Sequence, residues 1–282
     1  MKQLIRQIIT RGLKSLVKSN QKTKFGRYLN MQLINSLMEQ VAEINHNGLK
    51  LKFTTPNLLC RWRADTFSSK EPETLEWIDS IPMGAIIWDI GANIGLYSVY
   101  AAKKRKCKVW AFEPSVFNLE LLARNIYLND LTNDICIVPF ALNDKLGTSK
   151  LKLTTTEWGG ALSTFGQDFG WDGKVMNKVF EFQTIGLNME DALNLLEIPV
   201  PGYIKIDVDG LEHFILKGGK AILLHINEIL IEINDDFHEQ ADQCRDILIS
   251  CGLALKEKRH SEMISANTNG FQNSYNQIWI RK

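Results

Sequence analysis

A glycine-containing turn at Trp88–Gly95 (WDIGANIG) joins an apolar run to a helix-like segment and could hold a nucleoside. Such a turn brings backbone N–H groups and the positive end of a helix close to a ligand. The dinucleotide fingerprint needs glycine at the position of Asn93, where the backbone presses against a pyrophosphate, and Gly95 comes one residue early. The turn therefore predicts a nucleoside ligand without a pyrophosphate. S-adenosylmethionine (SAM) is such a ligand.

A carboxylate follows the next predicted strand. Glu113 comes after the apolar run 107–112, about 20 residues past the turn, where a carboxylate can accept both ribose hydroxyls of an adenosine. The segment 140–144, after the third predicted strand, is placed to form a wall for the adenine. The alternative is that the glycines serve only a tight turn and that Glu113 is a solvated strand end. The residues predicted to bind SAM are Asp89, Gly91, Asn93, Gly95, Glu113, Pro114, Ala141 and Leu142.

The run 203–212 (YIKIDVDGLE) is unusually charged for a central strand. A central parallel strand is normally almost all apolar, yet Lys205, Asp207 and Asp209 fall on one side of this one by period-two alternation. Buried charges are costly unless they are paired, so these residues indicate a site. A purely structural ion pair of Lys205 with Asp207 or Glu232 is the alternative.

Strands and helices alternate from Ile86 onward, which predicts a parallel sheet with helices on both faces. In such a sheet, ligands bind outside the carboxyl ends of the strands. The predicted strands are 86–90, 107–112, 135–139, 203–208 and 229–233, followed by an antiparallel hairpin at 253–258 and 277–281. The predicted helices are 95–104, 116–127, 189–196, 211–217 and 239–251.

The alternation pauses at about 143–187, where two strand-like segments, 148–153 and 179–185, flank a loop with four large aromatic side chains. Long loops inside compact domains are usually functional or disordered, and the aromatics argue against disorder. We expect a substrate-facing flap, with coverage of a core edge as the alternative. The expected organisation is a helical N-terminal extension at 1–50 and a catalytic domain at 51–282, in which 49–63 is extended.

The first 27 residues carry eight basic side chains, and no acid appears before Glu39. Apolar residues recur at helical spacing in the same segment, so it predicts a basic amphipathic helix. Such a helix can lie on an anionic membrane surface. The favoured alternative is that the apolar stripe packs on the domain or across a homodimer.

Bulk properties exclude several classes of protein. The net charge of +1 argues against a general nucleic-acid binder, and an apolar content of 45% suits a globular core. The five cysteines are scattered, without C-x-x-C or a nearby histidine at ligand spacing, which predicts a reduced, cytoplasmic protein without structural zinc. We see neither a signal peptide nor an apolar run of transmembrane length.

These motifs together resemble the FkbM-type SAM-dependent methyltransferases. The resemblance rests on WDIGANIG, Phe112-Glu113-Pro114, KIDVDGLE at 205–212 and Ile231-Glu232-Ile233, with 71–78 similar to the family's lead-in helix. It covers residues 60–282 and implies a Rossmann-like class I methyltransferase fold, an α/β fold with a mostly parallel seven-stranded sheet and a C-terminal antiparallel hairpin. It also implies O-methylation of sugars or related hydroxylated metabolites. The family commonly has Glu where Asp209 stands, which keeps the acid but shortens its reach.

Methyl transfer to a hydroxyl requires alignment of the acceptor and removal of its proton. Asp207 is the first candidate for the base, His238 the second, and Lys205 belongs to the same predicted catalytic group. A divalent cation held by Asp207, Asn234 and Asp235 is possible but not favoured. Two other functions stay open: an NAD-dependent oxidoreductase, which Asn93 opposes, and a SAM- or glycan-binding module without catalysis.

Overall fold

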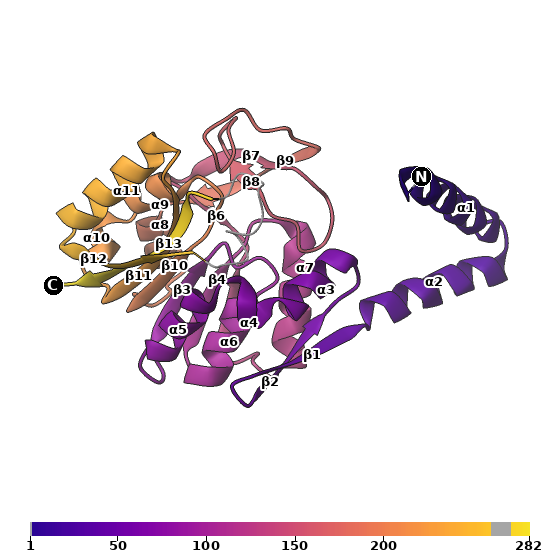
Figure 1. The fold of residues 1–282 in the computed structure, drawn as a ribbon, viewed down its shortest axis with the longest axis horizontal. Coiled ribbons are helices and arrows are strands. Elements are labelled where there is room, and N and C mark those ends of the chain that lie inside the picture. The colour runs from indigo at the N-terminus through magenta and orange to yellow at the C-terminus, as the bar shows by residue number, and fades with distance from the viewer. Residues whose placement is uncertain (1, 261–271) are drawn as a thin grey trace.

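A seven-stranded sheet forms the centre of the molecule, with strand order β12-β13-β11-β10-β3-β4-β5 (Figure 1). The computed structural model describes residues 2–260 and 272–282. The neighbouring strands from β11 to β5 are parallel, and β13 runs antiparallel to both β11 and β12. The strands are β3 (Ile86–Ile90), β4 (Lys108–Phe112), β5 (Ile135–Val138), β10 (Tyr203–Ile206), β11 (Glu228–Asn234), β12 (Leu253–Arg259) and β13 (Ser274–Arg281). The predicted parallel sheet with a C-terminal antiparallel pair is confirmed.

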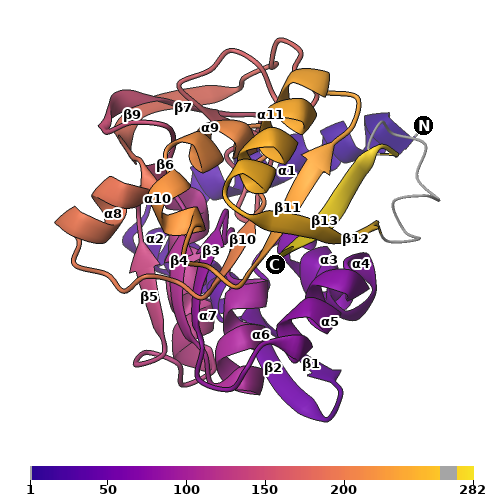
Figure 2. The ribbon, with the colours of Figure 1, turned by 90° about the vertical axis from the view of Figure 1, so that its left-hand side faces the viewer.

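Helices cover both faces of the sheet, because alternate strand residues bury apolar side chains on opposite sides (Figure 2). On β3, Ile87 belongs to one core cluster and Trp88 to the other. The first cluster packs against α5 (Pro72–Ser80), α6 (Leu96–Arg105) and α7 (Val116–Leu128). The second packs against α8 (Met189–Leu195), α9 (Glu212–Lys217), α10 (Lys220–Leu223) and α11 (His238–Ser250).

The predicted flap, together with residues 141–142 just before it, forms a second sheet of four strands in the order β6-β9-β7-β8. The sequence predicted its two long strands but missed the two short ones, because runs of two or three residues carry no periodicity. The flap strands are β6 (Ala141–Leu142), β7 (Gly147–Leu153), β8 (Ser163–Phe165) and β9 (Phe180–Leu187).

Residues 41–54 form a β-hairpin, so the helical character predicted for the extension at 1–50 is wrong from residue 41 onward. β1 (Val41–His46) pairs antiparallel with β2 (Leu49–Thr54) across the turn residues Asn47 and Gly48, which both have positive φ. This turn chemistry and the alternating pattern favour a hairpin over a helix. The extended segment predicted for 49–63 is also wrong after residue 54. Asn57 caps α3 (Leu58–Asp65), and α4 (Phe67–Lys70) follows it.

The N-terminal segment forms two helices, α1 (Lys2–Asn20) and α2 (Lys24–Met38), which extend away from the body (Figure 1). The apolar side chains of α1 are exposed, from Leu4 to Val17. The structure therefore does not show the packing of this stripe onto the domain that the sequence favoured. Among the described residues, we find no helix with the length and apolar character needed to cross a membrane.

Candidate cofactor and acceptor site

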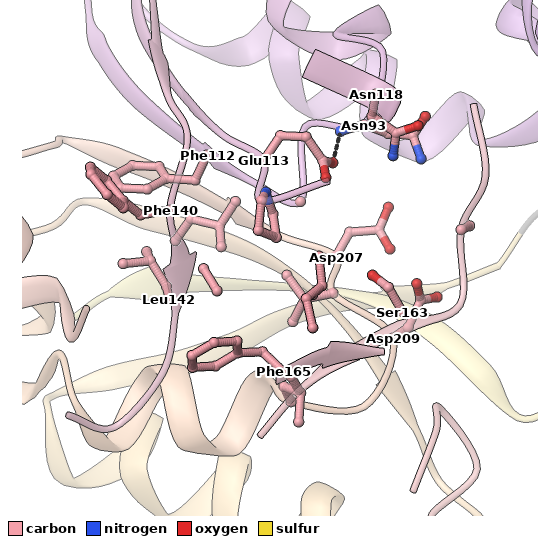
Figure 3. A pocket seen from close by; sticks show the side chains of 18 of the residues that line it. Asn93, Phe112, Glu113, Asn118, Phe140, Leu142, Ser163, Phe165, Asp207 and Asp209 are labelled. Atoms are coloured by element: carbon pink, nitrogen blue, oxygen red, sulfur yellow. Dashed lines mark hydrogen bonds between the residues drawn. The ribbon is translucent and has the colours of Figure 1, made fainter. Parts of the chain in front are cut away.

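A cleft with an empty volume of about 560 Å³, part of it open to solvent, lies at the carboxyl ends of β3, β4 and β10 (Figure 3). The flap closes its other side through residues 160–165. A second pocket of about 460 Å³ shares Gly91, Asn93 and Asp207 with the first, so the two spaces adjoin around these three residues. The predicted residues Gly91, Asn93, Glu113 and Asp207 therefore line one cleft at the edge of the parallel sheet.

The glycine turn is shaped by a close approach of two strand ends. Gly91 has φ +83°, and a Cβ built on it would lie 1.9 Å from the backbone oxygen of Asp207. Gly95, with φ +82°, precedes α6 and packs on Leu122, where a Cβ would lie 2.4 Å from a side-chain carbon. Gly91 therefore lines the site while Gly95 supports the turn from behind. Both glycines are required by packing as much as by any ligand.

Glu113 is the acid that the sequence assigned to the ribose. One carboxylate oxygen accepts from the backbone N–H of Asn93 at 2.8 Å (Figure 3). The other accepts from the backbone N–H of Ser115 at 2.7 Å. Burial raises the pKa of Glu113 to about 7, against the opposing effect of these hydrogen bonds. The Asn118 side chain also hydrogen-bonds this carboxylate. Since a carboxylate has about four lone-pair positions, the buried acid can still accept from a hydroxyl donor of a ligand.

One end of the cleft is apolar. The side chains of Phe112, Phe140, Leu142 and Phe165 gather on the side of the cleft away from Asp207 (Figure 3). Pro114 and Ala141, both predicted to bind the cofactor, also line this cleft. An apolar wall next to a buried carboxylate matches an aromatic base joined to a ribose.

A buried ionic cluster lies below the turn. Lys205 of β10 is the register partner of Asp89 on β3, and its Nζ is 3.8 Å from Asp89 Oδ1 and 3.1 Å from Asp207 Oδ2. The Nζ also lies 5.2 Å from the centre of the Tyr97 ring. Asp89 lines neither of the two adjoining pockets, and its Oδ1 has no hydrogen-bond partner among the described residues. Asp89 therefore contacts the site only through Lys205.

The charges of this cluster set the protonation of Asp207. The Lys205 ammonium and the nearby Lys70 outweigh burial and lower the pKa of Asp207 to about 2. Glu232 of β11 hydrogen-bonds Asp207, and burial beside Asp207 and Glu71 raises the pKa of Glu232 well above its usual range. Asp207 is thus an ionised carboxylate next to a carboxyl group whose pKa is raised. Of the two structural ion pairs considered for Lys205, the one with Asp207 is present. Glu232 contacts Asp207 rather than Lys205.

Asp209 brings a second carboxylate to the cleft. It has φ +60°, and its Oδ2 accepts from the backbone N–H of Leu162 in the flap at 2.7 Å. Burial and the neighbouring Asp207 raise the pKa of Asp209 to about 6. Glu212, the last acid of the motif, instead accepts from Gly210 N–H and holds the turn before α9. Asp207 and Asp209 therefore line the cleft, whereas Glu212 stabilises the turn before α9.

The flap is tied to the strand ends by asparagine side chains. Asn93 Nδ2 donates to the backbone oxygen of Gly160 at 2.8 Å, and Asn118 Nδ2 donates to the same oxygen at 3.1 Å. Asn118 Oδ1 accepts from Gly159 N–H at 3.1 Å. Sequence reasoning missed Asn118, because a single asparagine inside α7 carries no motif.

The four aromatic side chains of the flap have different surroundings, so the flap is only partly substrate-facing. Phe165 lines the cleft. Trp158 packs beside Cys60, and Phe169 meets Phe237 at a ring distance of 5.5 Å. The backbone oxygen of Trp171 accepts from Asn234. Trp158 and Phe169 thus cover edges of the core, as the alternative interpretation of this loop expected.

The other predicted catalytic and metal-binding residues lie apart from the cleft. His238 is exposed at the start of α11 and lines neither pocket. Asn234 donates to Trp171, and Asp235 forms an ion pair with Lys258. Because these contacts engage Asn234 and Asp235 elsewhere, the structure does not assemble them with Asp207 into one set of metal ligands. Within residues 2–260 and 272–282, no cluster of three or more His, Cys, Asp or Glu side chains suits a metal ion.

Comparison with known families gives a match over more than half of the chain. The family model described as Methyltransferase FkbM domain matches residues 89–255. The hexuronic acid methyltransferase AglP of Haloferax volcanii is 21% identical over 194 residues, which cover 69% of this chain and 74% of AglP. The methyltransferase sdnD of Sordaria araneosa is 37% identical over 75 residues, which cover 26% of this chain and 29% of sdnD.

Among solved structures, the fold is similar to that of Methyltransferase FkbM from Methylobacillus flagellatus KT, with a TM-score of 0.50 and 15% sequence identity. The similarity covers 89% of this chain and 58% of that chain. This chain thus spans less than two thirds of that structure and of sdnD.

Proposed function

The chain belongs to the FkbM methyltransferase domain family, and from that premise we propose that it is a SAM-dependent O-methyltransferase. The proposed acceptor is a hydroxyl group of a sugar or a related hydroxylated metabolite. The observation that carries the proposal is the single cleft that holds a buried Glu113, an apolar wall and the ionised Asp207. The relative AglP is named a hexuronic acid methyltransferase, which supports a sugar as the acceptor.

The residues of the cleft fit SAM. Glu113 would accept from a ribose hydroxyl with its remaining lone pair, and the rings of Phe112, Phe140 and Phe165 would flank the adenine. The adjoining pocket around Gly91 and Lys205 would take the amino-acid end of the cofactor. When bound, SAM supplies an electrophilic methyl group on a positively charged sulfur.

Asp207 is our first candidate for accepting the hydroxyl proton, because it lies where the two pockets meet. In the proposed reaction the acceptor oxygen forms a bond to the methyl carbon, the bond from that carbon to sulfur breaks, and the hydroxyl proton passes to the carboxylate. Lys205 keeps Asp207 ionised and in position. A pKa of about 2 ensures that the carboxylate is available at neutral pH, although it makes a weak base. Asp209, whose pKa is about 6, is the second candidate.

Alignment can provide much of the acceleration in such a reaction. Holding the acceptor oxygen in line with the transferred methyl group removes the entropic cost of bringing two reactants together. The flap residue Ser163 lies next to Asp209, whereas Phe165 lies on the apolar side of the cleft (Figure 3). The acceptor would therefore bind beside Ser163, where the flap meets the strand ends. Specificity for the acceptor would thus depend on the flap.

Calorimetric titration with SAM and with NAD tests the cofactor. We expect SAM to bind and NAD to bind weakly or not at all, because the turn has Asn93 in place of the glycine that a pyrophosphate needs. Transfer of tritium from methyl-labelled SAM to hexuronic acids, hexoses and their glycosides tests the activity. Tight binding of NAD would contradict the proposal. Binding of SAM without transfer to any hydroxylated acceptor would favour a module without catalysis.

A further inference from the structure

The helices α1 and α2 form an arm that extends from the body (Figure 1). Apart from Met38, the large apolar side chains that the structure describes on this arm are exposed. On α1, the side chains of Ile8, Leu13 and Leu16 are 57–61% exposed. At 100° per residue they share one broad face, and the basic side chains Arg11, Lys14 and Lys18, also exposed, share the opposite one. A soluble helix that is not covered rarely keeps so wide an apolar face, so this arrangement indicates a partner.

The elbow between the two helices is a specific structure. Asn30 Nδ2 donates to the backbone oxygen of Val17 at 3.3 Å, and Asn20 Nδ2 donates to Asn30 Oδ1 at 3.3 Å. Thr23 caps α2 by accepting from Gly26 N–H at 2.9 Å. A Cβ on Gly26 would lie 2.1 Å from the backbone oxygen of Asn20, so only glycine allows this approach. These contacts fix the direction in which α1 presents its apolar face.

The arm joins the body next to the candidate site. Met38, at the end of α2, is buried in a cluster with Cys60, Ile94 and Leu121, and Trp158 packs against the same cluster. Ile94 belongs to the glycine turn and Trp158 to the flap. If the arm binds a surface, the cleft would therefore lie at a defined distance from that surface.

Charge identifies the partner. The chain carries eight basic residues and no acid before Glu39. A second copy of the arm would offer the same sign of charge and no acidic group across the interface. The phosphate groups of anionic lipids offer the opposite charge, and the acyl region next to them accepts an apolar helix face. We propose that α1 lies on an anionic membrane surface, with its apolar face inserted and its basic side chains at the headgroups.

Vesicle flotation of the full-length protein tests this proposal. We expect it to float with vesicles of phosphatidylglycerol and phosphatidylcholine, to float far less with pure phosphatidylcholine, and to be released by high salt. Replacing Arg11, Lys14 and Lys18 together with Gln should lower partitioning about tenfold or more, since each basic residue adds to the attraction. The double substitution Ile8→Gln and Leu16→Gln should lower it by a similar factor because the inserted face is lost.

A matched control variant removes three positive charges from the body of the protein instead of from the arm. Lys145, Lys220 and Lys256 are exposed on the body, and their triple replacement with Gln should leave flotation unchanged. Circular dichroism melting should show the wild-type transition for every variant, because none of the substituted side chains is buried. Equal loss in the arm and control variants would overturn the proposal, as would absence of flotation with anionic vesicles. Sedimentation that shows a dimer, broken by Ile8→Gln and Leu16→Gln without any flotation, would assign the arm to a second copy instead.

Discussion

The two sides of the cleft are built differently. On the strand side, Gly91, Glu113 and Asp207 are held by parallel strands and by a buried ionic cluster. On the flap side, residues 159–162 lie outside the strands and are held by hydrogen bonds to the side chains of Asn93, Asn118 and Asp209. The strand side is thus part of the core, whereas the flap is attached to it at a few points. Under the proposed function, cofactor binding would therefore depend mainly on the core, and the choice of acceptor on an attached segment.

The strand side should tolerate substitution least. Gly91→Ala places a Cβ against the backbone of Asp207 at a positive φ, so we expect a loss of about 3 kcal/mol or more in the free energy of unfolding. Gly84 is the control, because it also has a positive φ, +76°, but no atom lies near its added Cβ. Gly84→Ala should cost only about 1–2 kcal/mol. Urea unfolding measures both, and equal losses would mean that the close approach does not constrain the turn.

Asp207→Asn should lower turnover by roughly a hundredfold or more, because it keeps the shape but loses the charge that accepts a proton. Asp242→Asn, in an exposed ion pair on α11, should leave the rate unchanged. The pH profile separates the two acids at the cleft. If Asp207 is the base, its pKa of about 2 gives a kcat at saturating SAM that is flat above about pH 4. If Asp209 is the base, its pKa of about 6 makes this kcat fall below pH 6. A folded Asp207→Asn variant with near wild-type turnover would make Asp207 structural.

SAM affinity should depend on pH through Glu113. Burial raises its pKa to about 7 in the free protein, and donor hydroxyls favour the ionised form. Binding should therefore weaken as the pH falls below 7, by up to about tenfold per unit, and level off above it. Glu113→Gln has no ionisable carboxyl group at this position, so the pH dependence of its SAM affinity reflects the amino group of SAM. The difference from the wild-type profile then gives the contribution of Glu113. Parallel profiles would show that Glu113 does not titrate on binding.

The flap should give the smallest effect, and one confined to the acceptor. The hydroxyl of Thr154 donates a hydrogen bond to the backbone oxygen of Ala161 at 3.0 Å. Thr154→Val removes this bond and should destabilise the ordered flap by about 1 kcal/mol. We expect the KM for the acceptor to rise a few fold while the Kd for SAM changes less than twofold. Thr148→Val, at an exposed position of β7, is the control. A larger effect on SAM than on the acceptor would contradict the division between the two sides.

The positions of the strand-side residues could be predicted from the sequence because their signals are local. The turn at 88–95 and the acid at Glu113 have fixed spacing, and the charges of β10 stand out in an apolar sheet. The contacts between segments could not be predicted in this way. Asn118 and Leu162 meet the motif residues only through the fold, and the pKa of Asp207 depends on Lys70 and Glu232, which lie far away in the sequence.

The N-terminal region shows the same limit. The sequence correctly predicted a basic amphipathic helix for α1, because helical periodicity is a local property. The β-hairpin at 41–54 was missed, although Asn47-Gly48 carries the turn signal. Whether the apolar face of α1 would be covered could not be read from periodicity, since the same stripe suits a core, a dimer and a membrane.

Calorimetric titration of SAM into Glu113→Ala tests the central claim most directly. The variant removes the acid that would accept from the ribose, so SAM affinity should fall by roughly 2 kcal/mol or more, about 30-fold. Glu120→Ala is the matched control, because Glu120 is an exposed carboxylate on α7 that pairs only at the surface with Arg124. We predict that Glu120→Ala binds SAM like the wild type. Unchanged SAM affinity in a folded Glu113→Ala variant would contradict the assignment of this cleft to SAM.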